Sequence, residues 1–179
     1  MKHQIVRSVA DLDRLEASVA ASAEHTARRL CESPIQSAGL SLLAALKFAP
    51  FGCDPLDSTR PLNFVEQLNQ TFTYLATIAA TRWLLLHHPQ NAPFVLNLGT
   101  RSGTDVSSQD GQIAAETFAA TDPDSNDKLR KDLAKVAESE ASIKYVFYLS
   151  PVPARRLAIP GVTVVRLEHT TLSALLLPE

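Results

Sequence analysis

Two acidic residues, Asp105 and Glu116, flank a strong hairpin signal. The dipeptide Asp110-Gly111 is typical of a two-residue type I′ turn, because both positions tolerate the positive φ that this turn requires. If these two residues form the loop, the strand register places Asp105 directly opposite Glu116. Opposed side chains on one face lie about 4.5–5.5 Å apart at Cβ, and like charges there repel each other. The sequence therefore predicts a carboxylate pair whose repulsion has to be relieved.

Three arrangements can relieve this repulsion. A divalent cation can bind between the carboxylates, one proton can be shared so that one pKa rises, or the side chains can splay into water. Hard cations such as Mg²⁺ prefer oxygen ligands and often use one or two carboxylates with waters and substrate phosphates. A bound cation would therefore suit phosphodiester hydrolysis. The residues alone leave all three arrangements open.

The acidic pair belongs to a strand-rich second half of the chain, where the apolar pattern changes after Pro93. We expect strands at 94–98, 104–109, 112–120, 145–149 and 161–167, with a helix at 129–137. The strand, helix and strand between 112 and 149 should form a crossover that places two strands parallel.

The first half of the chain carries helical patterns. Ser8 can cap a helix whose apolar residues recur at steps of three and four up to Leu30. A short helix at 39–48 and a loop at 50–61, rich in proline, should precede the longest helix, at 62–88. The apolar stripe expected on that helix consists of Val65, Leu68, Phe72, Leu75, Ala79 and Leu86. Glu66 lies on a polar flank beside it.

This order of acids and elements resembles the PD-(D/E)XK, or restriction-endonuclease-like, nuclease superfamily over about residues 62–167. The matching features are Glu66 on a core helix, Asp105 on a strand and Glu116 on the next strand, followed by a helix and two strands. The resemblance implies an α/β fold with a mixed sheet flanked by helices, here with extra N-terminal helices. It implies that Asp105 and Glu116 bind Mg²⁺ or Mn²⁺ and that Glu66 holds a second metal or a water.

The sequence departs from that superfamily at its lysine. The residue two positions after the second acid is typically Lys there, and here it is Phe118, which can neither carry charge nor donate a hydrogen bond. Lys128 is the favoured substitute, because the turn at 122–126 returns the chain beside the strand that carries Glu116. Lys131 and Lys144 are further candidates. Without a substitute lysine, the resemblance implies hydrolysis that is weak or lost.

The composition favours one folded domain. Hydrophobic residues make up 45% of the 179 residues and charged residues 20%, which is close to globular averages. We expect a single domain over 1–179, with an N-terminal helical region and loop at 1–60, the nuclease-like core at 61–168 and a tail at 169–179. The N-terminus lacks the apolar run of a signal peptide, and no apolar stretch is long enough to span a membrane. These features predict a cytoplasmic protein without a membrane partner.

The net charge limits the functions that the sequence supports. The net charge of −2 gives no general attraction to phosphate backbones, so a nucleic-acid partner needs a local basic patch. The leading hypothesis is a divalent-metal-dependent nuclease, or a nucleic-acid-binding protein derived from one. The alternatives are a catalytically inactive interaction or regulatory module, and a protein that uses the same carboxylates on a small phosphorylated ligand. A homo-oligomer is compatible with each of these hypotheses.

Overall fold

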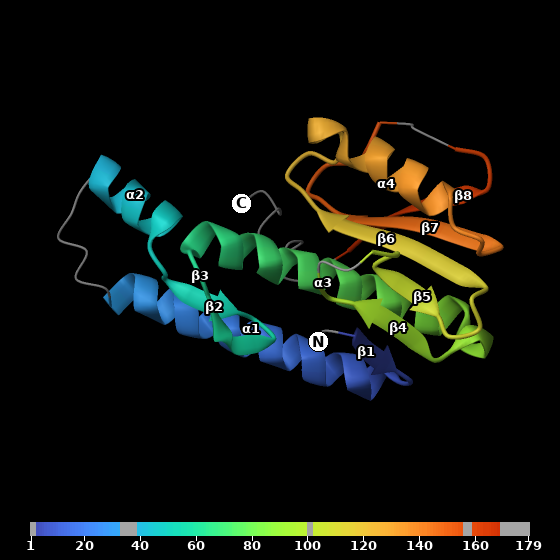
Figure 1. Ribbon diagram of the computed structural model, residues 1–179, viewed down its shortest axis with the longest axis horizontal. Coiled ribbons are helices and arrows are strands. Elements are labelled where there is room, and N and C mark those ends of the chain that lie inside the picture. Colours follow the sequence, from blue (N-terminus) through green and yellow to red (C-terminus); the bar gives the residue numbers. More distant parts are fainter. Residues whose placement is uncertain (1–2, 33–38, 100–101, 156–158, 169–179) are drawn as a thin grey trace, which may run out of the picture. The chain divides into compact units, whose positions relative to one another are not determined.

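The computed structural model of the protein describes residues 3–32, 39–99, 102–155 and 159–168 (Figure 1). The tail expected at 169–179 lies outside the described residues. The described chain divides into two compact units. One unit comprises the residues up to Leu12 and those from Ala76 onwards, and the other comprises the described residues from Asp13 to Leu75.

The first unit is built on a mixed six-stranded sheet with the order β1-β4-β5-β6-β7-β8. The strands are β1 (His3–Val6), β4 (Phe94–Asn97), β5 (Val106–Ser108), β6 (Ile113–Ala119), β7 (Ile143–Leu149) and β8 (Val162–Leu167). Neighbours from β1 to β6 pair antiparallel, whereas β6, β7 and β8 pair parallel. The mixed α/β class and the parallel pairing across the predicted crossover are confirmed.

The strand β1 was not expected from the sequence. It pairs with β4 from His3↔Asn97 to Val6↔Phe94, and of its four residues only Val6 is buried. An edge strand that buries one side chain has almost no alternating pattern to reveal it. Its partner lies some ninety residues away, so its pairing depends on tertiary contacts.

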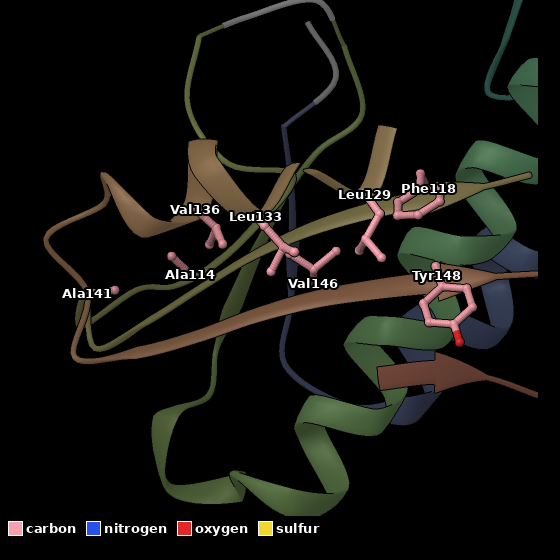
Figure 2. Close-up of a cluster of buried hydrophobic side chains, with 8 residues drawn as sticks. All are labelled: Ala114, Phe118, Leu129, Leu133, Val136, Ala141, Val146 and Tyr148. Carbon is pink, nitrogen blue, oxygen red and sulfur yellow. The ribbon is translucent and has the colours of Figure 1, made fainter. Parts of the chain in front are cut away.

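The helix α4 (Lys128–Ala137) covers one face of β6 and β7. Its buried residues Leu129, Leu133 and Val136 pack with the side chains that Figure 2 shows around them, which are Ala114, Phe118, Ala141, Val146 and Tyr148. Side chains alternate between the two faces of a strand, so Ala114, Glu116 and Phe118 of β6 all point towards α4. The acidic residue of β6 is thereby placed under this helix.

The helix α3 (Phe64–His87) buries a different stripe from the one that the sequence predicted. Leu68 and Leu86, expected in the core, are 45% and 68% exposed, whereas the buried residues include Gln67, Thr71, Thr77 and Thr81. Thr71 and Thr81 donate their hydroxyls to the carbonyls of residues 67 and 77, one turn earlier. A threonine can be buried when its hydroxyl donates a hydrogen bond within its own helix. The spacing of the apolar residues therefore did not identify the buried side of α3.

The C-terminal half of α3 lies against the face of the sheet opposite to α4. Thr77 hydrogen-bonds to Thr117 of β6 at 2.8 Å, and Trp83 packs edge-on against Tyr145 and Phe147 of β7. Because Thr117 and Glu116 are adjacent in β6, their side chains leave opposite faces. The first unit is therefore layered, with helix on either side of the strands β6 and β7.

The second unit holds most of α1 (Val9–Glu32), the short helix α2 (Leu40–Phe48), a hairpin and the first half of α3. The hairpin consists of β2 (Gly52–Asp54) and β3 (Asp57–Leu62), joined at Pro55 and Leu56, where a loop was expected. A two-stranded sheet has only edges, so Pro61 can occupy a strand without leaving a ladder position empty. None of the helices in the described part of the chain combines the length and apolar character that crossing a bilayer demands.

Candidate functional site

The register of the hairpin formed by β5 and β6 is the one that the sequence predicted. Val106 pairs with Ala115 and Ser107 with Ala114, and one further step in this register brings Asp105 opposite Glu116. The two carboxylates also interact electrostatically, because the charge of Asp105 raises the pKa of Glu116. The predicted register is thus confirmed, whereas Asp105, expected within a strand, directly precedes β5.

The turn that sets this register differs from the predicted type I′ turn. Gly111 donates its backbone N–H to the carbonyl of Ser108 at 3.0 Å, and Gly111 has a φ of 74°, whereas Asp110 is not among the residues with positive φ. The carboxylate of Asp110 instead accepts hydrogen bonds from the Ser108 hydroxyl and from the N–H of Gln112. These bonds hold Asp110 in an ordinary turn conformation, so only the glycine supplies the left-handed residue.

Asp105 directly precedes β5 and is fixed to the neighbouring strand. Its Oδ2 atom accepts hydrogen bonds from the backbone N–H of Thr117 at 2.8 Å and from the Thr117 hydroxyl at 3.3 Å. The side chain is half-buried. Because Thr117 follows Glu116 in β6, this attachment keeps the carboxyl group of Asp105 next to Glu116.

Glu116 is the most unusual residue of the site, because its carboxylate is only 2% exposed. Its Oε2 atom accepts a hydrogen bond from Lys135 Nζ at 2.8 Å, and its Oε1 atom has no hydrogen-bond partner among the described residues. Burial and then the charge of Asp105 raise the pKa of Glu116 to about 7, against the opposing effect of Lys135. Of the arrangements considered from the sequence, splaying into water does not apply to Glu116.

The lysine that binds Glu116 is Lys135. The favoured candidate, Lys128, donates to Asp132 Oδ1 at 2.6 Å, and its Nζ atom lies 5.7 Å from the ring centroid of Phe118. The other candidates bind backbone carbonyls: Lys131 donates to Asn126 and Lys144 to Ala137. Residue 135 lies two turns after residue 128 on the same side of α4, so the helix delivers its lysine from further along than expected.

Asp132 also belongs to the surroundings of Glu116, because its charge contributes to the raised pKa of Glu116. It is 4% exposed, and its Oδ2 atom has no hydrogen-bond partner among the described residues. Burial is the main cause that raises the pKa of Asp132, and the hydrogen bond from Lys128 opposes it. Its position three residues after Leu129 and four before Val136 places Asp132 within the apolar stripe, which is the signal that could have identified it.

Phe118 fills the core where the superfamily would place a lysine. Its side chain is 3% exposed and stacks on Tyr148, with ring centroids 5.9 Å apart (Figure 2). Its neighbours from α4 are Leu129 and the aliphatic residues of the same cluster. Position 118 therefore contributes to packing under α4.

Glu66 lies in the second unit and caps α3. Its Oε2 atom accepts the backbone N–H of Asn63 at 3.1 Å, while the Asn63 side chain accepts the N–H of Glu66 at 2.8 Å. This reciprocal pair is a capping box, which satisfies two backbone donors at the start of a helix. The structure thus gives Glu66 a local structural role, and a metal role for it stays a prediction.

The donors of the site are suited to a hard cation. Within the described ranges, no group of three or more His, Cys, Asp or Glu side chains is arranged to hold a metal ion. Mg²⁺ commonly binds through only one or two carboxylates and keeps several waters. Glu116 Oε1, a buried carboxylate oxygen without a partner, is the kind of atom that such an ion completes.

Comparison with protein-family models, with curated proteins and with solved structures gave no significant match.

Proposed function

We propose that this protein is a divalent-metal-dependent phosphodiesterase of the nuclease type, or a nucleic-acid-binding protein derived from one, with weak hydrolytic activity. The observation that carries the proposal is the state of Glu116. This buried carboxylate lies beside Asp105 and accepts a lysine ammonium on one oxygen, while its other oxygen has no hydrogen-bond partner in the described part of the chain. Two acids and a lysine are the set of groups that the superfamily uses.

The order of the elements supports the proposal. The chain runs through α3, the antiparallel strands β4, β5 and β6, then α4, and finally the parallel strands β7 and β8. Asp105 directly precedes the second strand of this series and Glu116 lies in the third. This is the sequence of elements and acids on which the resemblance to the PD-(D/E)XK superfamily depends.

Each residue of the site would have a separate chemical role. Asp105 and Glu116 would hold Mg²⁺ or Mn²⁺, which when bound lowers the pKa of a coordinated water and neutralises phosphate charge. Lys135, whose side chain is 47% exposed, can direct its remaining N–H donors towards a phosphate oxygen. It would supply the positive charge that Phe118 cannot.

The position of Lys135 also explains why we expect weak hydrolysis. Its ammonium donates to Glu116 at 2.8 Å, so part of its hydrogen-bonding capacity is used within the site. Losing one donor aimed at charge in the transition state typically costs about 10²–10³ in rate. Because Lys135 is shared between Glu116 and the substrate, we expect hydrolysis that is slower than that of a fully active enzyme. The loss in rate should be smaller than that caused by removing the donor altogether.

Cleavage assays on single- and double-stranded DNA and RNA in Mn²⁺ test the proposal. We expect slow cleavage by the parent protein and loss of cleavage in Glu116→Gln and in Lys135→Ala. The matched control is Lys131→Ala, on the same helix, whose ammonium binds a backbone carbonyl and not an acid of the site. Lys128→Ala separates the two lysine assignments, and a stronger loss there than in Lys135→Ala would favour Lys128.

Three results would change the conclusion. Cleavage that is unaffected by Glu116→Gln would exclude these residues as the active site. No cleavage of any substrate, together with nucleic-acid binding that Lys135→Ala weakens, would favour a binding protein. If the protein neither cleaves nor binds nucleic acid, the interaction or regulatory module is favoured.

A further inference from the structure

Two carboxylate oxygens of the first unit are buried and have no hydrogen-bond partner among the described residues, Glu116 Oε1 and Asp132 Oδ2. The side chains that carry them are 2% and 4% exposed. A buried charged acceptor without a donor is unfavourable unless a cation completes it or the group takes up a proton. Both atoms belong to carboxyl groups, so each of them carries charge when its side chain is ionised.

The helix α4 brings these two residues to the same interface. Its buried side is formed by Leu129, Asp132, Leu133 and Val136. Lys135, three residues after Asp132, reaches Glu116 of β6 from this helix. The charge of Asp132 also acts on Glu116, and the charge of Asp105 acts on both. Asp132 therefore faces the same group of acids as Glu116.

We infer that Asp132 is a further ligand of the divalent cation, which binds through Oδ2 of Asp132 together with Oε1 of Glu116. This inference rests on the proposed function and adds a residue outside the superfamily pattern, because Asp132 lies on the helix that follows the second acidic strand. Two free carboxylate oxygens, with waters and a substrate phosphate, meet the usual needs of Mg²⁺.

Each of the two carboxylates divides its oxygens in the same way. Asp132 Oδ1 accepts from Lys128 at 2.6 Å and Glu116 Oε2 accepts from Lys135 at 2.8 Å, while the second oxygen of each carboxylate has no partner among the residues that the structure describes. The side chains of Lys128 and Lys135 are 46% and 47% exposed, so both lysines are partly accessible to solvent. The lysines therefore hold the acids in place and compete with a cation for their charge.

Calorimetric titration with Mn²⁺ alone tests the inference on the full chain. Asp132→Asn keeps the shape of the side chain and an oxygen for Lys128, and we expect it to weaken Mn²⁺ binding by about tenfold or more, as loss of groups at metal sites does. The control is Asp127→Asn, since Asp127 lies just before α4 and is an exposed acid paired with Arg130. Its affinity for Mn²⁺ should equal that of the parent.

A second variant should change the affinity in the opposite direction. Lys128→Met removes the ammonium that competes for Asp132, so Mn²⁺ should bind more tightly, by roughly threefold or more. This result decides the question if Asp132→Asn fails to fold. Unchanged affinity in Asp132→Asn, or in Lys128→Met if that is the only folded variant, would overturn the inference.

The same titrations separate this inference from the proposed function. If Glu116→Gln and Asp105→Asn weaken Mn²⁺ binding while Asp132→Asn and Lys128→Met do not change it, Asp132 is no ligand and the proposed site stands. If the parent protein binds no Mn²⁺ at millimolar concentration, the metal site falls, and the role of Asp132 falls with it.

Discussion

At the scale of single residues, Glu116 is a buried carboxyl group of the first unit whose charged form is unfavourable. In the unfolded chain this carboxyl group has its ordinary pKa of 4.5, whereas burial, followed by the charge of Asp105, raises its pKa in the folded protein to about 7. The folded state therefore holds the proton more tightly. Stability should fall as the pH rises from about 4.5 to about 7, by at most roughly 3 kcal/mol at 1.36 kcal/mol for each pKa unit.

Glu116→Gln should remove this loss of stability. Above pH 7 we expect the free energy of unfolding of the variant to exceed that of the parent by about 1–3 kcal/mol. The lost bond to Lys135 makes this gain smaller than the full effect of the pKa shift. Near pH 4 the difference should vanish, because Glu116 is then protonated in both states. Urea unfolding at the two pH values measures this. Glu138→Gln, at an exposed position just after α4, should change stability little at either pH.

The same titration should control metal binding. A carboxylate must lose its proton to bind a cation, so Mn²⁺ affinity should rise with pH through about 7 and level off above it. Each bound ion should also release protons to the buffer near neutral pH. Calorimetry in buffers of different ionisation enthalpy measures that release. Affinity that is flat between pH 5 and 8 would contradict a role for Glu116 as a ligand.

At the scale of elements, the packing of α4 on β6 explains why the motif lysine cannot simply be restored. Phe118→Lys would place an ammonium among Leu129, Tyr148 and the rest of the cluster in Figure 2. We expect a loss of about 3–5 kcal/mol in the free energy of unfolding, comparable with removing a buried aromatic side chain. Chemical denaturation measures it, with Phe118→Leu as the milder control. A stable variant with enhanced cleavage would show that position 118 can reach the site.

The hairpin of the second unit depends on a glycine. A Cβ atom on Gly52 would lie 1.6 Å from Oε1 of Gln67, whose Nε2 atom donates to the Ser22 hydroxyl at 3.1 Å. Gly52→Ala should therefore force the Gln67 side chain to move and lower the free energy of unfolding by about 1–3 kcal/mol. The double variant Gly52→Ala with Gln67→Ala tests the cause. The second substitution should cost less in this background than in the parent, as thermal unfolding of the four proteins would show.

At the scale of the whole molecule, the net charge of −2 restricts how nucleic acid can bind. The cations of α4 are Lys128, Arg130, Lys131 and Lys135, and Arg130 is paired with Asp127. Binding should therefore displace few counterions, and the slope of log K against log salt should be about −4 or shallower, since each neutralised phosphate contributes roughly −0.9. Fluorescence anisotropy across a salt series measures the slope. A steeper slope would require a basic surface elsewhere on the chain.

The sequence alone determined the α/β class, the strands from Phe94 onwards and the placement of Asp105 beside Glu116. These features depend on local information. Alternation along a strand and a short turn fix the register, and a register error of one residue would turn every side chain to the wrong face. The register was correct even though the turn proved to be of another type, because both turns place the same residues opposite each other.

The tertiary structure decided which charged residues meet at the site. Lys128 and Lys135 look alike along the sequence, and only the position of α4 over β6 assigns Lys135 to Glu116 and buries Asp132. The strand β1 and the hairpin of β2 and β3 also required partners that a local pattern does not identify. How far a helix lies along a sheet depends on the packing of both surfaces, here Leu129, Leu133 and Val136 against β6 and β7, so it emerges only when the elements are assembled.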